Sequence, residues 1–197
     1  MAIAHRNTAQ WQAMDASHHI HPFCDPKTLA ERGVRVITSA DGCYVYDSDN
    51  NKILDGMAGL WCVNVGYGRQ ELVDVATAQM EQLPFYNSFF QSSTPSQIEL
   101  AQKLSEIAPG NLNHFFFANS GSESVEAALR LARQATGRAN IIVFDGGFHG
   151  RTMAAASLTT SGTKVRTGFH PMMAGVEVSP FPHAYRYGWS EEQATEF

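Results

Sequence analysis

Apolar residues recur with helical spacing in several separate stretches of the chain. This periodicity predicts helices over residues 8–15, 70–83, 93–107 and 124–134. In the first of them, Trp11 and Met14 fall on one face. Pro84 and Pro109 close the second and third helices, because proline lacks the amide hydrogen that a helix interior needs. Gly137 is expected to end the fourth.

A period of two predicts antiparallel β structure over residues 34–57. Val34, Val36 and Thr38 recur at every second position, and the pair Asp41–Gly42 is typical of a hairpin turn. A polar turn over residues 47–51 then leads into a further strand. This part of the chain is therefore expected to form a β-meander.

From residue 114 onward the pattern changes to alternating strands and helices. Residues 114–118 predict a short apolar strand, and the helix over 124–134 follows it. Residues 141–144 (IIVF) are wholly apolar, as in strands buried on both faces of a parallel sheet. Strand, helix and strand predict a right-handed βαβ unit, with a later short strand near residues 175–178. The fold class expected is α/β, with an N-terminal α+β segment before the start of a mostly parallel sheet.

Composition narrows the class of protein. The 197 residues are 44% hydrophobic and 17% charged, which predicts a soluble globular protein with a substantial core. The net charge of −5 and the absence of a basic stripe argue against nucleic-acid binding. No apolar stretch approaches the roughly 20 residues of a membrane span. Three cysteines without CxxC spacing and no secretory leader indicate a reducing compartment, so a cytoplasmic location is expected.

Three histidines, His18, His19 and His21, lie close together and raise the possibility of a metal site. Pro22 indicates an extended, irregular segment, and the sequence pattern places no further histidine, cysteine or carboxylate pair at a zinc-like spacing. The expectation from the sequence is that no metal is bound here.

Two loops carry candidate chemistry. Residues 119–124 (NSGSES) join a predicted strand to a helix, where unpaired N–H groups and the hydroxyls of Ser120 and Ser122 suit a phosphate, and Gly121 allows close approach. The alternative is that a serine only caps the helix. In the loop after the next strand, Phe148 could stack on a flat heterocycle beside His149. The alternative there is a core Phe148, with His149 bonding backbone locally.

These residues resemble segments of the class III (subgroup II) aminotransferases. The phosphate turn and the second loop of that family are similar to residues 117–123 (FANSGSE) and 147–152 (GFHGRT). Segments 54–61 (LDGMAGLW), 64–68 (NVGYG) and 83–87 (LPFYN) resemble ω-amino-acid:pyruvate members. Segments 168–171 (GFHP) and 180–182 (PFP) are closer to 4-aminobutyrate members.

The resemblance implies a pyridoxal 5′-phosphate (PLP) enzyme of fold type I that works as a homodimer. Residues 1–67 would start the small domain, and residues 68–197 the PLP-binding large domain. The resemblance assigns the phosphate to Ser120, Gly121 and Ser122, the pyridine ring to Phe148, and a place in the same pocket to His149. It assigns the substrate pocket to Phe23, Trp61 and Phe89, for which ordinary core aromatics are the alternative.

The family also needs an aspartate at the pyridine nitrogen and a Schiff-base lysine, and the resemblance puts both after residue 197. None of Lys27, Lys52, Lys103 and Lys164 has the family context. The chain is thus expected to be a fragment, inactive by itself, of an enzyme that transfers nitrogen from an ω-amino acid or amine to pyruvate or 2-oxoglutarate. Two alternatives remain: another fold type I activity (a decarboxylase or aminomutase), or a non-catalytic remnant that binds a phosphate ligand or a partner chain.

Overall fold

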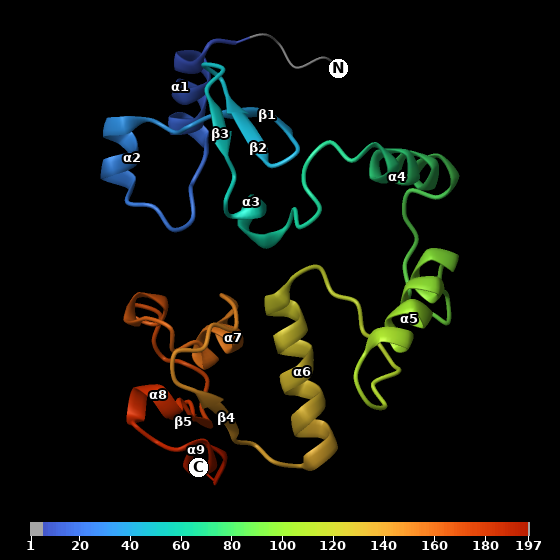
Figure 1. Cartoon of the computed structure of the whole chain (residues 1–197), viewed down its shortest axis with the longest axis vertical. Coiled ribbons are helices and arrows are strands. Elements are labelled where there is room, and N and C mark those ends of the chain that lie inside the picture. Colours follow the sequence, from blue (N-terminus) through green and yellow to red (C-terminus); the bar gives the residue numbers. More distant parts are fainter. Residues whose placement is uncertain (1–5, 197) are drawn as a thin grey trace. The chain divides into compact units, whose positions relative to one another are not determined.

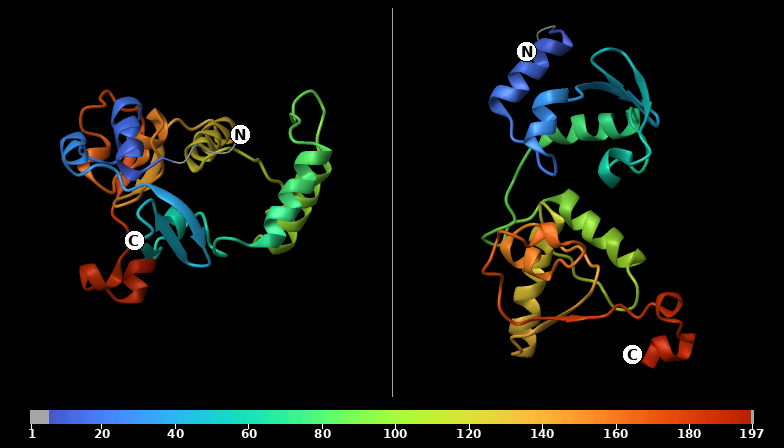
Figure 2. Two further views of the ribbon diagram at one scale, coloured as in Figure 1. Left: turned by 90° about the horizontal axis from the view of Figure 1, so that it is seen from above. Right: turned by 90° about the vertical axis from the view of Figure 1, so that its left-hand side faces the viewer.

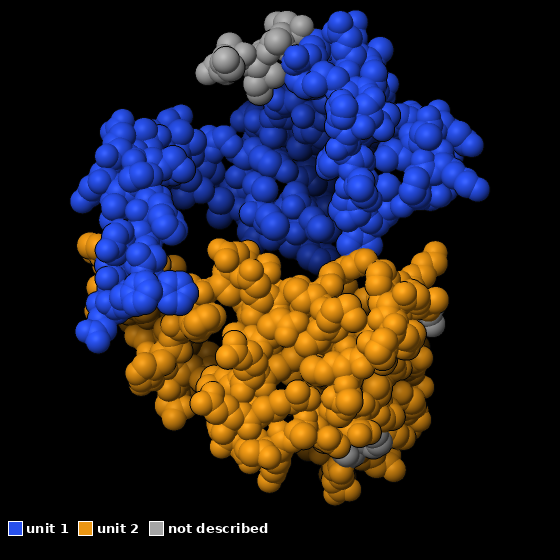
Figure 3. All heavy atoms as spheres, turned by 180° about the vertical axis from the view of Figure 1, so that it is seen from behind, with its two compact units in different colours: residues 1–94 blue, residues 95–197 orange. Residues whose placement is uncertain are grey.

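The structure is a computed structural model that describes residues 6–196. The chain forms two compact units, residues 1–94 and 95–197, which are coloured separately in Figure 3. Residues 68–94, assigned from the sequence to the large domain, belong to the first compact unit. The boundary between the domains of a complete protein stays a prediction.

The first unit contains two N-terminal helices, a small sheet and two further helices (Figure 1). In chain order these elements are α1 (Thr8–His18), α2 (Pro26–Arg32), β1 (Ile37–Asp41), β2 (Tyr44–Asp47), β3 (Lys52–Leu54), α3 (Ala58–Trp61) and α4 (Gln70–Gln82). The strands pair antiparallel in the order β1-β2-β3, so the predicted meander is confirmed. The predicted helices over 8–15 and 70–83 are confirmed as α1 and α4.

Local side chains define the ends of α1 and α2. Asn7 caps α1 and forms a reciprocal capping box with Gln10, which satisfies two amide hydrogens at the helix start. Asp25 caps α2 by accepting hydrogen bonds from the first-turn amides. The amide of Gln12 in α1 donates to the carbonyl oxygen of Val34 at 2.9 Å and ties this helix to the chain that enters β1.

The meander is extended by one pair of hydrogen bonds beyond β3. Tyr67 exchanges backbone hydrogen bonds with Gly42 in the β1–β2 turn, at 2.7 and 3.2 Å. The backbone approaches so closely that a Cβ at Gly66 would lie 2.9 Å from the carbonyl oxygen of Gly42, and Gly66 has a φ of +84°. Glycine is required at residue 66 for both reasons.

The second unit is built around one long helix and a two-stranded sheet (Figures 1 and 2). Its elements are α5 (Pro95–Ile107), α6 (Gly121–Thr136), β4 (Ile141–Phe144), α7 (Met153–Leu158), a 3₁₀ turn (Thr163–Val165), β5 (Val176–Ser179), α8 (Ala184–Tyr187) and α9 (Glu191–Glu196). The predicted helices over 93–107 and 124–134 are confirmed as α5 and α6. Gly137 ends α6 in the left-handed conformation, as expected.

The core of the second unit lies where α6, β4 and α7 meet. Leu129 from α6, Val143 from β4 and Leu158 from α7 are buried together. Partly buried residues extend this cluster, among them Val125 and Val176. The first unit contributes none of the buried hydrophobic residues in the described part of the chain.

The βαβ unit differs from the one that the sequence predicted. Residues 114–118 form no strand, and Phe116 is 79% exposed. A strand requires a hydrogen-bonded neighbour, and no described segment pairs with these residues. The parallel pair is instead β4 and β5, with Ile141 opposite Val176, and α7 lies in the connection between them. The predicted strands at 141–144 and near 175–178 are both confirmed.

One face of the β4–β5 sheet is largely uncovered among the described residues, where Phe144 meets only the ring of Phe181 edge-on. Ile142 is 73% exposed and Phe144 is 49% exposed, whereas Val143 on the opposite face is buried. The expectation that residues 141–144 are buried on both faces is therefore wrong for this chain. The expected substantial core is likewise absent from the described part, because α6 and α7 cover only one side of two strands.

The two helices α4 and α5 are amphipathic, as their periodicity predicted, but their apolar residues remain exposed. Val75 in α4 and Ile107 in α5 are 69% and 68% exposed. Among the helices described in residues 6–196, none has the length and apolar character to cross a membrane.

Candidate functional site

The N-terminus of α6 presents free backbone donors. Ser120 caps the helix by accepting a hydrogen bond from the N–H of Glu123 at 3.2 Å, so the capping alternative is confirmed. The carboxylate of Glu123 accepts from the N–H of Asn119 at 2.8 Å. These bonds leave the N–H groups of Gly121 and Ser122 without a partner among the described residues. Capping by Ser120 is therefore compatible with anion binding, since two donors and the positive end of the helix dipole stay available.

The second loop lies directly against this helix terminus. The N–H of Arg151 donates to the hydroxyl oxygen of Ser122 at 3.1 Å. A Cβ on Gly150 would collide with the Ser122 hydroxyl and lie 2.9 Å from its Cβ, so only glycine permits this approach. The hydroxyl of Thr152 donates to the carboxylate of Glu126 at 2.5 Å. The structure thus joins the two loops that the sequence singled out.

Two threonines behind the second loop hold its backbone in place. The N–H of His149 donates to the hydroxyl of Thr159 at 3.0 Å, and Thr159 is completely buried. The N–H of Gly147 donates to the hydroxyl of Thr160 at 3.1 Å, and the N–H of Thr160 donates back to the carbonyl oxygen of Gly147 at 2.8 Å. The sequence reasoning missed this pair. Nothing in the pattern distinguishes these threonines from ordinary residues at a helix end.

Phe148 projects from this anchored loop. Its side chain is 55% exposed, so the alternative of a core phenylalanine does not hold in this chain. The ring of His149 lies against Gly147, where an added Cβ would be 2.9 Å from Nε2. An exposed aromatic ring in a loop that contacts a helix terminus with free N–H groups and a serine hydroxyl suits a flat heterocycle that carries a phosphate. The donor set therefore fits PLP.

The predicted substrate residues belong to the first unit, whereas the cofactor residues belong to the second. Phe23, Trp61 and Phe89 are 78%, 76% and 71% exposed, so none is a core aromatic in this chain. Phe23 and Trp61 have φ angles of 56° and 65°, and the two residues after Phe89, Phe90 and Gln91, have 56° and 64°. Positive φ is costly for such side chains, and strained positions of this kind cluster at functional sites.

The turn that carries Trp61 is held by Asp55. The carboxylate of Asp55 accepts hydrogen bonds of 2.7 Å from the hydroxyl of Tyr67 and from the N–H of Gly59. These bonds hold the pKa of Asp55 below its ordinary value, with the Tyr67 hydroxyl as the largest cause. Left-handed dihedrals at Gly59 and Leu60 show that α3 is a strained turn and not a regular helix. Because Trp61 immediately follows these residues, its position depends on Asp55.

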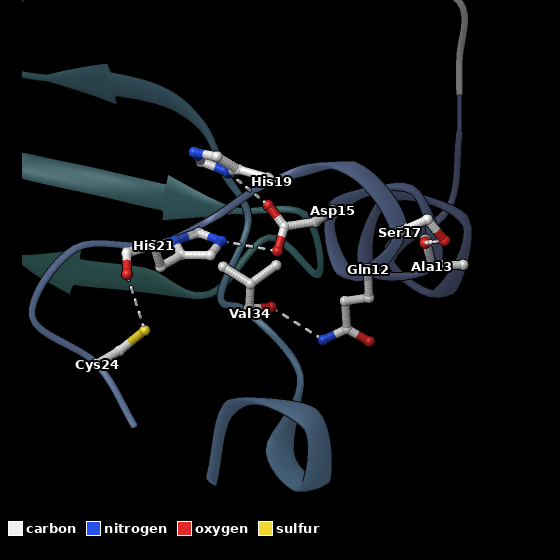
Figure 4. Close-up of polar contacts among 8 residues, drawn as sticks. All are labelled: Gln12, Ala13, Asp15, Ser17, His19, His21, Cys24 and Val34. Carbon is white, nitrogen blue, oxygen red and sulfur yellow. Dashed lines mark hydrogen bonds and ion pairs between the residues drawn. The ribbon is translucent and has the colours of Figure 1, made fainter. Parts of the chain in front are cut away.

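The histidine run contains a cluster that the sequence reasoning missed. Asp15 lies within hydrogen-bond distance of both His19 and His21, whereas His18 is not part of the cluster (Figure 4). The spacing of four residues between Asp15 and His19 is the signal that could have revealed it, because such residues share one face of a helix.

Comparisons with known proteins define the class and then the family. The fold matches the N-terminal part of ω-transaminases of PLP fold type I. A structure of an (S)-enantioselective ω-transaminase from Thermomicrobium roseum superposes with a TM-score of 0.92 at 36% identity, over 98% of this chain and 45% of that one. The ω-transaminase from Pseudomonas jessenii in complex with pyridoxamine 5′-phosphate (PMP) superposes with a TM-score of 0.87 at 34% identity, over 94% of this chain and 43% of that one.

The family model for class-III aminotransferases matches residues 28–196, and the chain belongs to this family. It is 49% identical to a putrescine–pyruvate aminotransferase from Pseudomonas aeruginosa over 162 residues. The matched region is 79% of this chain and 36% of that relative. An acetylornithine aminotransferase from Archaeoglobus fulgidus is 41% identical over 171 residues, with coverages of 87% and 42%. The chain thus spans about two fifths of the length of these relatives. The resemblance that the motifs indicated is confirmed.

Proposed function

We propose that this chain is part of a PLP-dependent transaminase that takes nitrogen from an ω-amino acid or amine and gives it to pyruvate or 2-oxoglutarate. Its relatives support this substrate class, since they include a putrescine–pyruvate aminotransferase and probable γ-aminobutyrate transaminases. A related structure with PMP supports the choice of cofactor. We further propose a homodimer in the cytoplasm.

The contact between Ser122 and the backbone of Arg151 is the observation that carries this proposal. The hydroxyl of Ser122 accepts one hydrogen bond from the second loop and keeps its own proton to donate to a phosphate oxygen. The N–H groups of Gly121 and Ser122 add two donors at the helix terminus. One serine thereby fixes the distance between the phosphate donors and the loop that carries the stacking ring.

Phe148 and His149 would bind the ring end of the cofactor. Phe148 presents an exposed aromatic face, and His149 is fixed beside it through its backbone bond to Thr159. The chemistry that PLP supplies when bound is an electron sink for negative charge on the substrate. The role of these two side chains is to orient the ring and to exclude water from its faces.

Phe23, Trp61 and Phe89 would form an apolar wall for the substrate. Three large, exposed aromatic side chains favour the carbon chain of an amine over a second carboxylate. The positive φ angles at or next to all three support a functional role, because such conformations are kept only where the surroundings enforce them.

Two experiments test the proposed function. In the first, PMP is titrated into the purified chain and its Ser122→Ala and Ser124→Ala variants. Ser124 is a matched control, since its hydroxyl donates to the carbonyl oxygen of Ser120 in the same helical turn and makes no hydrogen bond to the second loop among the described residues. Loss of the Ser122 hydroxyl is expected to weaken binding by about ten- to hundredfold, as for a hydrogen bond to a charged group. Equal affinities in all three proteins would contradict the phosphate site.

In the second, the complete protein is assayed with putrescine, 4-aminobutyrate and other ω-amines against pyruvate and 2-oxoglutarate. Transfer of the amino group to one of the keto acids is expected. Release of carbon dioxide, or migration of the amino group within one substrate, would favour a decarboxylase or an aminomutase. A complete protein that binds PMP but consumes no amine would favour a non-catalytic role.

A further inference from the structure

The end of α1 brings three potential metal ligands together in the first unit. Nδ1 of His19 lies 2.9 Å from one carboxylate oxygen of Asp15, and Nε2 of His21 lies 2.8 Å from the other. All three ligand atoms fall within 4.8 Å of one another. Figure 4 shows both imidazole rings directed at the Asp15 carboxylate.

Local structure produces this convergence. Asp15 and His19 are four residues apart, and the N–H of His19 donates to the carbonyl oxygen of Asp15 at 2.9 Å in the last helical bond of α1. The chain then leaves the helix and turns, which returns His21 to the same carboxylate. The thiol of Cys24 donates to the carbonyl oxygen of His21 at 3.4 Å and closes this turn. The two histidine rings lie 4.1 Å apart between centroids.

We propose that Asp15, His19 and His21 bind a divalent transition-metal ion, with Zn²⁺ as the preferred example. Two imidazole nitrogens and one carboxylate oxygen form a familiar zinc ligand set, in which the fourth position holds water. Zinc bonds to nitrogen and oxygen ligands are about 2.0–2.2 Å long. The three ligand atoms already lie within 4.8 Å of one another, so small side-chain rotations are enough to place all of them at that distance from one ion. The ion binds the ring nitrogen of each histidine that faces the carboxylate, and the single proton of each neutral ring is then on its other nitrogen, so no proton is lost.

The surroundings of the cluster favour a cation. It lies at the C-terminal end of α1, an 11-residue helix, where the helix dipole places partial negative charge. Asp15 adds a carboxylate, whose oxygens lie 2.9 and 2.8 Å from the two imidazole nitrogens. The side chains of Asp15 and His21 are only 19% and 20% exposed, whereas that of His19 is 60% exposed. The site is therefore sheltered on one side and open to solvent on the other.

Metal binding would order the segment that follows the cluster. Phe23 lies two residues after His21 with a φ of 56°, and Asp25 then caps α2. An ion that joins α1 to His21 would restrict the chain on the N-terminal side of Phe23. The metal would thus be structural, and its binding does not depend on the cofactor site in the second unit.

The test is a titration of Zn²⁺ into the purified chain without PLP or phosphate, followed by Co²⁺ absorption spectroscopy. One saturable equivalent and a tetrahedral Co²⁺ spectrum are expected. Asp15→Asn, His19→Gln and His21→Gln should each weaken Zn²⁺ binding at least about tenfold, because even neighbours of ligands cost that much. His18→Gln is the matched control. His18 is the last residue of α1 and is exposed, yet lies outside the cluster, so its loss should change the affinity by less than about twofold.

The comparison of His18→Gln with His19→Gln is decisive. If both variants weaken binding equally, the ion is held by a loose histidine-rich segment and the proposal is overturned. It is also overturned if the unsubstituted chain shows no saturable binding. Circular dichroism of each variant checks that α1 is retained. Because His21 lies outside α1, His21→Gln removes a ligand without changing the helix. The outcome is separate from PMP binding, which reports on the other unit.

Discussion

The hydroxyl of Tyr67 donates a hydrogen bond of 2.7 Å to the carboxylate of Asp55, across 12 residues of chain. Asp55 follows β3, and Tyr67 pairs through its backbone with Gly42 in the β1–β2 turn. The bond therefore closes the strained turn of α3 against the meander. Because the same carboxylate accepts the N–H of Gly59, it connects the backbone before Trp61 to the sheet.

Acid is expected to weaken this closure. The pKa of Asp55 is lowered in the folded chain, with the Tyr67 bond as the largest cause. A lowered folded pKa stabilises the fold above the ordinary aspartate value of about 3.9, and this stability is lost as pH falls through the folded value. Tyr67→Phe should raise the pKa of Asp55 and move acid unfolding to higher pH. An NMR titration of Asp55 and circular dichroism against pH measure both effects.

Tyr46→Phe serves as the control for that prediction. Tyr46 lies in β2 of the same meander, and no hydrogen bond of its hydroxyl is recorded. Its loss should leave the pKa of Asp55 and the acid transition unchanged. Identical acid transitions for Tyr67→Phe and the unsubstituted chain would show that the bond does not stabilise the fold.

Gly150 is expected to tolerate no side chain. Gly150→Ala places a Cβ against Ser122 at a φ of +130°, so both the collision and the backbone strain oppose it. The expected loss is about 1–3 kcal/mol in the free energy of unfolding, together with weaker PMP binding. Gly146→Ala in the same loop is the matched control, because Gly146 also has a positive φ (+82°) but a Cβ there meets nothing within 4 Å. Urea unfolding should rank Gly150→Ala as the more damaging change, and equal losses would contradict the role of the close approach.

Thr159 is expected to stabilise the second loop through its hydroxyl. Thr159→Val keeps the shape of the completely buried side chain but leaves the part-buried N–H of His149 without its acceptor. An unsatisfied buried donor costs about 1–3 kcal/mol, which chemical denaturation can measure. Thr159→Ser keeps the hydroxyl and should retain the loop, as judged by PMP affinity. If Thr159→Ser weakens PMP binding more than Thr159→Val does, the methyl group and not the hydroxyl positions the loop.

Phe148 is expected to contribute to cofactor affinity by stacking. Phe148→Ala should weaken PMP binding by about two- to tenfold, which corresponds to the 0.5–1.5 kcal/mol of an aromatic pair. Phe148→Tyr preserves the ring face and should bind PMP like the unsubstituted chain. Fluorescence titration measures both. Because Phe148 is 55% exposed, its replacement should change the free energy of unfolding little, and a large loss of stability would indicate a core role instead.

The four longest helices (α1, α4, α5 and α6) and the meander followed from local signals. The capping residues Asn7 and Ser120, and the terminator Gly137, act within a few residues of the elements that they bound. The candidate cofactor site also followed from local signals, since its residues lie in two short motifs. The strand at 114–118 could not be decided in this way, because an apolar pentapeptide becomes a strand only when a neighbour supplies hydrogen bonds. The pairing of Thr159 with His149 escaped prediction because it joins segments ten residues apart through a fold that no periodicity encodes.

The sequence by itself determined the four longest helices, the hairpin turns and the family, because these depend on residue types at short, fixed spacings. Only the tertiary structure decided that Ser122 touches the backbone of Arg151, that Asp55 closes the turn before Trp61, and that Asp15 gathers two of the three histidines. Each of these contacts depends on where the intervening backbone turns. The direction of a turn results from many weak packing and hydrogen-bonding interactions acting together, and not from any one residue.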